Sequence, residues 1–325
     1  MLRFAPRDMR AMSTNARAHA RLGVRRRTDG AMSIAVIINP VAGNVAPDRA
    51  RRFAEVAAAV LATLGEQSEI SVTERPGHAR ELAVAAVARG ARVVFAWGGD
   101  GTVNEVGTAL AFGPAALGIV PSGSGNGLAR SLDIARRPEQ ALAEAVGATP
   151  RRIDVGELGG RRFLNVAGVG FDAAVARGFA RRARRSGGWW GYARVAAQEM
   201  LTYRPQAYRI TAPGGVTACR ALLVTFANSP EYGNGARIAP GARVDDGWLE
   251  LVTIEARSSA RMLWAAPRLF TGGIGRVAGV TISRIRTATI EGEGPLLFHV
   301  DGDAVQGGDR LEARVHPAAL AVCVR

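Results

Sequence analysis

Residues 93–110 read VVFAWGGDGTVNEVGTAL, and this stretch decides the fold. Its first five residues are apolar, as in a strand that is buried on both faces. A loop of glycines around one aspartate follows at 98–101, and a helix is predicted from about residue 102 to residue 110. A buried strand that leads through a glycine loop into a helix is the repeating unit of a parallel α/β sheet.

The same pattern extends in both directions along the chain. Short apolar runs at 34–38 and 117–120 are each followed by a loop that contains glycine. Residues 47–64 and 78–89 carry small or apolar side chains in helix-like segments that end at glycine. We therefore predict an α/β domain with a parallel, doubly wound sheet over residues 33–150.

The pattern of predicted elements changes after about residue 150. Gly159-Gly160 and Gly214-Gly215 separate pairs of strand-like runs, which is typical of β-hairpins. We predict a mainly antiparallel, β-rich second domain over residues 151–325, with helical insertions near 171–203 and 258–270. Its last strand or strands could return to the first domain, and a cleft is expected between the two domains.

Residues 1–32 differ from the rest of the chain. They carry eight arginines against two aspartates, and their apolar residues lack a sustained period. We expect either a disordered basic extension or a misassigned start, with Met32 as the true first residue.

The composition excludes several classes of protein. All 42 Lys and Arg residues are arginine, so the lysines of a P-loop, of a protein kinase and of Schiff-base chemistry are absent. Two cysteines exclude a disulfide scaffold and fit a cytoplasmic protein. No apolar run reaches the roughly 18 residues of a membrane span. The net charge of +14 predicts attraction to polyanions.

Three loops with glycine follow predicted strands, at 39–44, 98–102 and 121–127. Ligands of an open parallel sheet bind at the carboxyl ends of its strands, where backbone N–H groups and helix N-termini can hold phosphate. Each loop alone could be an ordinary turn, but three at one edge favour a phosphate site. Asp100 would repel phosphate unless a cation lay between them, which indicates a Mg²⁺-nucleotide site.

Several motifs together resemble the diacylglycerol kinase catalytic-domain family, which includes bacterial soluble lipid kinases, sphingosine kinases and ceramide kinases. The motifs follow the family's order over residues 33–325. They are Asn39-Pro40-x-x-Gly43, Gly98-Gly99-Asp100-Gly101-Thr102-Val103-Asn104-Glu105, Pro121-Ser122-Gly123-Ser124-Gly125-Asn126, Gly168-Val169-Gly170-Phe171-Asp172-Ala173, Asp245-Asp246-Gly247-Trp248-Leu249 and Val300-Asp301-Gly302-Asp303. NAD kinases and phosphofructokinase-like folds share the glycine–aspartate loop, so the later motifs make the resemblance specific.

The resemblance implies a two-domain kinase that uses ATP and Mg²⁺. Asp246 is expected to bind a structural Mg²⁺ together with the backbone oxygens of Arg243 and Trp248. The residues expected to contact ATP are Asn39, Pro40, Val41, Ala42, Gly43, Thr73, Gly98, Gly99, Asp100, Gly101, Thr102, Val103, Asn104, Glu105 and Ser124.

The resemblance also implies an acceptor site. Asp301 and Asp303 are expected near the transferred phosphate and the accepting hydroxyl; either is a candidate base, and Asp100 is a third. Asp172 is expected to contact the lipid head group. Bacterial diacylglycerol kinases typically carry an aspartate where this chain has Gly127, and the usual Asp-Gly-Glu ends here in Asp303. Both departures leave the lipid open.

Two features also have ordinary interpretations. The Asp-Gly pairs at 245–247 and 301–303 are common turn sequences. His299 alternates with Phe298 and Val300 and is expected on the surface or in the core of a strand.

Residues 177–194 form a basic segment without an acidic residue. Its arginines are Arg177, Arg181, Arg182, Arg184, Arg185 and Arg194, and Trp189, Trp190 and Tyr192 lie among them. A solvated loop is one interpretation, and nucleic-acid binding lacks a supporting motif. We expect peripheral contact with an anionic membrane, because tryptophan favours the interface and arginine favours anionic lipid.

The sequence therefore predicts an ATP- and Mg²⁺-dependent lipid kinase that acts on diacylglycerol or on a sphingoid or ceramide-type lipid. It is expected to be cytoplasmic, peripherally membrane-associated and without a specific nucleic-acid partner, and homodimer formation is left open. Two alternatives remain: a soluble-substrate kinase like NAD kinase, and an inactive regulator that binds lipid or nucleotide.

Overall fold

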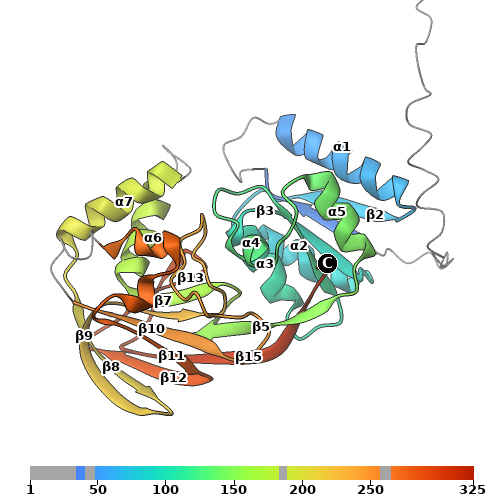
Figure 1. The fold of residues 1–325 in the computed structure, drawn as a ribbon. Helices are drawn as coiled ribbons and strands as arrows, with labels where there is room; N and C mark the ends of the chain where they lie inside the picture. The colour runs from blue at the N-terminus through green and yellow to red at the C-terminus, as the bar shows by residue number, and fades with distance from the viewer. Residues whose placement is uncertain (1–33, 41–47, 183–188, 257–264) are drawn as a thin grey trace, which may run out of the picture. The chain divides into compact units, whose positions relative to one another are not determined.

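The computed structural model describes residues 34–40, 48–182, 189–256 and 265–325, and Figure 1 shows them as a ribbon. The predictions for residues 1–32 and for the beginning of the insertion near 258–270 lie outside this description. The first half alternates strands with helices, in the order β1 (Ile34–Ile38), α1 (Asp48–Thr63), β2 (Ser68–Val72), α2 (His78–Ala88), β3 (Val93–Gly98), α3 (Asp100–Leu110), β4 (Ala116–Pro121), α4 (Gly127–Ser131) and α5 (Pro138–Gly147).

The strands β1 to β4 form a parallel sheet in the order β2-β1-β3-β4. Successive side chains of a strand point to opposite faces, so each continuous apolar run supplies two cores. Ile38 and Trp97 pack on the face covered by α1 and α5, whereas Ile37 and Ala96 pack on the face covered by α2 and α3 (Figure 1). Burial on both faces explains why these strands read as unbroken apolar runs.

The second half is built mainly of strands that pair antiparallel with one another. In chain order its elements are β5 (Arg151–Leu158), β6 (Arg161–Phe163), β7 (Val166–Gly170), α6 (Phe171–Arg182), α7 (Trp189–Thr202), β8 (Gln206–Ala212), β9 (Gly215–Ala227), β10 (Leu249–Glu255), α9 (Arg268–Thr271), the 3₁₀ turn η2 (Ile274–Arg276), β11 (Val280–Ile285), β12 (Thr287–Gly292), β13 (Leu297–Val300), β14 (Asp303–Gln306) and β15 (Arg310–Val322).

The long strand β15 joins the two halves. It pairs antiparallel with β12 and β5, and its end runs parallel to β4. Its register shifts between His316 and Leu320, where Ala318 has a φ of 50°. The buried carboxylate of Asp154 holds this bend, because it accepts hydrogen bonds from the N–H groups of Ala318 (2.8 Å) and Gly247 (2.6 Å). One strand therefore connects the parallel and the antiparallel parts of a single sheet.

The predicted fold class is confirmed: a parallel α/β sheet precedes a mainly antiparallel, β-rich second half. Helix α3 begins at Asp100, two residues before the predicted start. The expected cleft stays a prediction. No helix among the described residues is long and apolar enough to cross a membrane.

Candidate active site

The glycine loops that follow β3 and β4 lie against each other. The two strands are parallel, with Gly98 opposite Pro121, so both end at the same edge of the sheet. A Cβ atom added to Gly123 would lie 2.6 Å from the Cα of Gly99. Glycine at position 123 is therefore required for the backbones of the two loops to approach this closely.

The loop after β1 reaches the same edge through Asn39. Its Nδ2 donates a hydrogen bond of 2.9 Å to Oγ1 of Thr102, in the first turn of α3. Thr102 packs over Gly98, where an added Cβ would lie 2.4 Å from the Thr102 hydroxyl oxygen. Three residues predicted to contact ATP are thus brought together. Three others lie outside the described residues: Val41, Ala42 and Gly43.

Asp100 stands between the second and third loops. Its Oδ1 accepts a hydrogen bond of 2.6 Å from the N–H of Gly127, and a Cβ added to Gly125 would lie 2.6 Å from its Oδ2. Burial raises the pKa of Asp100 to about 6; the Gly127 hydrogen bond lowers it in part, and the charge of Asp301 raises it. A carboxylate held at a cost to its charged form is typical of functional sites.

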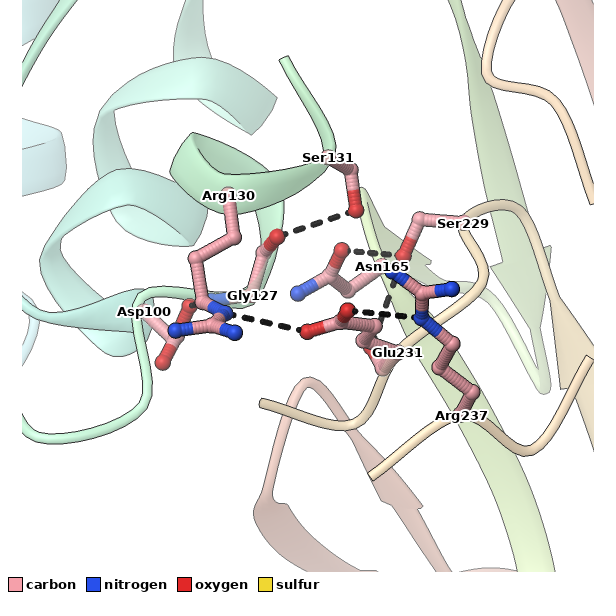
Figure 2. A network of polar contacts seen from close by, with 8 residues as sticks. All are labelled: Asp100, Gly127, Arg130, Ser131, Asn165, Ser229, Glu231 and Arg237. Carbon is pink, nitrogen blue, oxygen red and sulfur yellow. Dashed lines mark hydrogen bonds and ion pairs between the residues drawn. The ribbon is translucent and has the colours of Figure 1, made fainter. Parts of the chain in front are cut away.

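A polar network connects the third loop with the second half of the chain (Figure 2). The buried carboxylate of Glu231 accepts hydrogen bonds from Nε of Arg130 (3.1 Å) and from Nε of Arg237 (3.2 Å). The N–H of Asn234 also donates to the carbonyl oxygen of Gly125 (3.3 Å). Arginines from the two halves thus share one carboxylate beside the loop.

Asn165 fills the space beside Gly127 (Figure 2). A Cβ atom added to Gly127 would lie 2.3 Å from Nδ2 of Asn165, whose Oδ1 accepts a hydrogen bond from the hydroxyl of Ser229. A side chain at position 127 would therefore have to displace Asn165 from this bond.

Asp301 is held by four hydrogen bonds. Its Oδ2 accepts from Nδ2 of Asn104 (2.7 Å) and from the N–H of Leu164 (2.8 Å), and its Oδ1 accepts from the N–H groups of Asn165 and Val166 (both 2.9 Å). Burial raises the pKa of Asp301, and these hydrogen bonds oppose the rise. The carboxylate is fully engaged in joining α3 to the segment before β7.

Asp303 lies two residues further along, at the start of β14, and is exposed. Its carboxylate has no hydrogen-bond partner within the described part of the chain. Partial desolvation nevertheless raises its pKa; the charges of Asp301 and Glu105 raise it further, and Arg161, together with His299 when its ring is protonated, opposes them. Of the two carboxylates in this motif, only Asp303 has both oxygens available to a substrate.

Comparison with known proteins identifies the family. Residues 33–158 match the diacylglycerol kinase catalytic domain, and residues 165–324 match the YegS C-terminal NAD kinase beta sandwich-like domain. A Pseudomonas aeruginosa protein named "Probable lipid kinase YegS-like" is 32% identical over 272 residues, which cover 82% of this chain and 89% of the relative. The chain belongs to the diacylglycerol kinase family of lipid kinases.

Other members extend the comparison. A protein named "Diacylglycerol kinase" from Mycobacterium tuberculosis is 31% identical over 281 residues, which cover 83% of this chain and 88% of the relative. The crystal structure of a diacylglycerol kinase from Bacillus anthracis has a TM-score of 0.68 at 19% identity and covers 90% of this chain and 97% of that chain. The second likeness bears on the fold alone.

Some residues of this lipid kinase that were expected to contact ATP have other partners or surroundings. The carboxylate of Glu105 accepts hydrogen bonds from the N–H groups of Gly77 (2.9 Å) and Ala79 (3.0 Å), at the beginning of α2. Thr73 is buried directly after β2, and Ser124 is exposed. Their contact with ATP stays a prediction. The rest of the set lies after β1 or in the first turn of α3: Pro40, Gly101 and Val103.

Asp172, the predicted lipid contact, is buried in the first turn of α6. Its Oδ2 accepts hydrogen bonds from the hydroxyls of Thr225 (2.7 Å) and Tyr232 (3.1 Å). Direct contact between Asp172 and a lipid stays a prediction.

The residues predicted to hold a structural Mg²⁺ are arranged around ion pairs. Oδ1 of Asp246 accepts a hydrogen bond from the N–H of Trp248 (3.1 Å), and its Oδ2 is paired with Arg284. Asp245 lies 3.5 Å from Nε of Arg243. No group of three or more metal-ligating side chains occurs among the residues that the structure describes. Arg284 supplies the counter-charge of Asp246 in this arrangement, and the Mg²⁺ assignment stays a prediction.

Two cavities of about 530 Å³ each lie in the second half. One lies between the glycine turns at 159–160 and 307–308, and the other lies beside Tyr208 and Glu291. Neither is lined by the carboxylates described above.

Several residues of the site were not found from the sequence. Asn104 was predicted as an ATP contact, and its bond to Asp301 was not foreseen. Asn165 and Glu231 belong to no motif, although glycine and polar residues at 228–235 indicate a loop. Their role depends on the way the second half packs onto the third glycine loop.

Asp100→Asn should stabilise the fold above pH 6. The pKa of Asp100 rises from 3.8 to about 6 on folding, so its contribution to stability is complete below pH 4 and is lost as the pH rises through 6. Asparagine does not ionise, so the variant does not lose stability as the pH rises. Its melting temperature should match the parent's near pH 4 and exceed it above pH 6.

Asp301→Asn should instead lower the melting temperature at every pH, because its amide –NH₂ would face N–H donors, at about 1–3 kcal/mol for each donor left unsatisfied. Calorimetry from pH 4 to 8 measures the melting temperature of both variants. If Asp100→Asn and Asp301→Asn shifted the melting temperature in the same direction above pH 6, the different roles given to the two carboxylates would be contradicted.

Arg284→Gln should make the thermal stability depend on Mg²⁺. Asp246 then lacks its counter-charge, and a cation bound to the folded state raises the melting temperature. Arg286→Gln is the matched control, because Arg286 lies over the Trp248 ring at 4.4 Å, as Arg284 does at 5.2 Å, and is not paired with Asp246 in the described chain. Thermal shifts across a Mg²⁺ titration test this. An equal response in the parent and both variants would mean that Arg284 does not exclude a cation.

Proposed function

We propose that this protein transfers the γ-phosphoryl group of ATP to a hydroxyl group of a lipid. The observation that carries the proposal is the hydrogen bond of 2.7 Å between Asn104 and Asp301. It attaches the turn that bears Asp303 to the helix that begins in the glycine loop. Phosphoryl transfer depends mainly on holding the two reactants together and on neutralising charge, which is what adjacent nucleotide and acceptor sites provide.

The nucleotide is proposed to bind at the glycine loops. Backbone N–H groups at the N-terminus of α3, with the hydroxyl of Thr102 and the amide of Asn39, would hold the phosphates without a lysine. The single carboxylate of Asp100 at this edge suits a Mg²⁺ ion that arrives with ATP, since Mg²⁺ commonly uses one or two carboxylates together with phosphate oxygens. Asp100 would hold it, and the ion would neutralise phosphate charge.

Asp303 is proposed as the general base. Asp301 uses both oxygens to hold the site together, so its protonation would disrupt the site. Asp303 is exposed and has a raised pKa, which brings it closer to the pH at which a base accepts a proton efficiently. It would orient the lipid hydroxyl and take its proton.

The acceptor is proposed to be a diacylglycerol or a sphingoid or ceramide-type lipid, bound between the two halves on the side of Asp172. Radiolabelled ATP supplied with vesicles of each lipid, with phosphatidylglycerol and with NAD tests the proposal. Labelled lipid supports it. Labelled NAD alone would favour a soluble-substrate kinase, and no labelled product, with nucleotide or lipid still bound, would favour an inactive regulator.

Asp303→Asn should lower kcat about 10²–10⁴-fold, the usual scale for the loss of a general base, while the KM for ATP changes little. Asp303→Glu, which restores the family's usual residue, should retain activity. Asp309→Asn is the control, because Asp309 is also exposed and lies in the next loop. Steady-state kinetics with saturating Mg²⁺ measure these effects. Normal activity of the Asp303→Asn variant would mean that Asp303 is not the general base.

The segment 177–194 is proposed as the membrane-docking surface. It begins on α6, the helix that carries Asp172, and the side chains of Arg177, Arg181 and Arg194 are exposed. Arg184 and Arg185 lie outside the described residues. Near an anionic surface each arginine contributes about 1 kcal/mol, reduced by salt over a Debye length of about 8 Å. Docking here would bring the lipid to the helix that holds Asp172.

Glutamine at positions 181, 182, 184 and 185 should weaken binding to anionic vesicles and raise the KM for vesicle-borne lipid. Turnover of a short-chain, water-soluble analogue should not change. The control replaces four exposed arginines elsewhere, Arg51, Arg52, Arg136 and Arg137, and removes the same charge. Vesicle sedimentation at several salt concentrations and the two kinetic assays measure the difference. Equal losses in the two quadruple variants would mean that total charge, and not this segment, drives binding.

A further inference from the structure

A buried carboxylate and a buried histidine face each other beneath the β13–β14 turn. Nε2 of His299 lies 3.2 Å from Oδ2 of Asp172, and both side chains are less than a tenth exposed. His299 belongs to β13, and Asp172 follows β7, the strand that pairs with β13. A buried ionisable pair is costly unless hydrogen bonds satisfy it, so the remaining partners of this pair are informative.

Asp172 is satisfied on both oxygens. Its Oδ1 accepts a hydrogen bond from the N–H of Ala173 (2.8 Å), and its Oδ2 accepts from the hydroxyls of Thr225 (2.7 Å) and Tyr232 (3.1 Å). Gly168 makes room for it, because a Cβ there would lie 2.5 Å from Oδ2. The carboxylate is therefore built into the core and has no face open to a ligand.

The other ring nitrogen of His299 reaches the turn between the two acceptor-site carboxylates. The N–H of Gly302 donates to Nδ1 of His299 across 3.4 Å. Because Nδ1 accepts, a neutral imidazole carries its proton on Nε2, which faces Asp172; this tautomer is assigned from the partners. Within the described residues Nε2 makes no aligned hydrogen bond, so its contact with Asp172 is electrostatic.

The turn itself leaves little freedom between His299 and Asp303. Asp301 and Gly302 both have positive φ, 46° and 91°, and Val300 pairs with Asp303 across the hairpin. Two positive φ angles in a two-residue loop describe the tight turn that Asp-Gly favours. The direction of the Gly302 N–H therefore sets the direction in which β14 leaves the turn, beginning with Asp303.

We propose that Asp172 and His299 are positioning residues that act through the Gly302 N–H to place Asp303, and that Asp172 does not itself contact the lipid. The inference rests on the proposed function, in which Asp303 is the base. Asp172 orients the imidazole, the imidazole holds the turn, and the turn aims the carboxylate. Loss of the contacts from Asp172 through His299 to the Gly302 N–H would change the position of the Asp303 carboxylate, although the carboxylate itself would remain.

Two substitutions of His299 separate its two contacts. His299→Asn places an acceptor where Nδ1 lies and loses the contact with Asp172, whereas His299→Gln places a donor where Nε2 lies and loses the acceptor for Gly302. We expect His299→Gln to lower kcat about 10- to 100-fold, the scale of a misplaced catalytic group, with an unchanged KM for lipid, and His299→Asn to lose less. A purely structural role predicts the reverse order, because asparagine leaves the larger cavity.

The matched control uses a second histidine–carboxylate pair. His316 on β15 lies 3.0 Å from Glu157, away from Asp303, and its Asn and Gln variants should leave kcat unchanged. Asp172→Asn should lower kcat at constant lipid KM, and its combination with His299→Gln should be no worse than the stronger single variant. A rise in lipid KM confined to Asp172→Asn would show direct lipid contact and overturn the proposal.

An NMR measurement separates failure of this inference from failure of the proposed function. Long-range ¹H–¹⁵N spectra of the parent, assigned with histidine variants, report which nitrogen of His299 is protonated, and amide exchange reports the Gly302 N–H. We expect a proton on Nε2, and faster Gly302 exchange in His299→Gln than in His299→Asn. A proton on Nδ1, or equal exchange in both variants, overturns the inference even if no lipid is phosphorylated. The expected spectra with no lipid kinase activity would overturn only the proposed function.

Discussion

The site depends on the way one carboxylate is satisfied. Asp301 accepts hydrogen bonds from Asn104 on α3 and from three consecutive N–H groups at residues 164–166, which lead into β7. These donors come from two separate parts of the chain and Asp301 comes from a third, and each donor needs an acceptor once it is removed from water. The requirement that four donors share two oxygens therefore fixes α3, the start of the second half and the β13–β14 turn relative to one another.

The hydrogen bonding of Asp301 places the acidic residues of the site in different environments. Both oxygens of Asp301 accept hydrogen bonds from within the protein, while Asp303, two residues away, is exposed and has a raised pKa. Asp100 is held at a pKa of about 6 by burial. Titratable groups in different environments take on different roles, so one family motif holds a carboxylate that is enclosed by donors and, in the proposed function, a reactive one. The raised pKa of Asp100 and Asp303 is a cost in stability that the site tolerates.

Local patterns predicted the parallel sheet and its glycine loops, because a strand buried on both faces and a glycine turn leave marks within a few residues. The same patterns could not choose between Asp301 and Asp303, since the partners of Asp301 lie more than 130 residues away in sequence. They left open a return of the last strand to the first domain, and they did not predict the bend in β15, where Pro317 and the left-handed Ala318 interrupt the alternation. Glu231 gave no local sign, because its function as a shared partner exists only when both halves are folded.

Gly127 shows how a departure from a family pattern can be absorbed by its surroundings. An aspartate there would meet Nδ2 of Asn165 and would add a negative charge next to Asp100, whose pKa is already raised by burial and by Asp301. Glycine leaves the volume to a neutral amide, while the backbone N–H at this position, which any residue except proline would supply, donates to Asp100. The hydroxyl of Ser229 then fixes the orientation of Asn165. The missing acid thus corresponds to a different neighbourhood for Asp100, in which the amide of Asn165 takes the place of a second carboxylate.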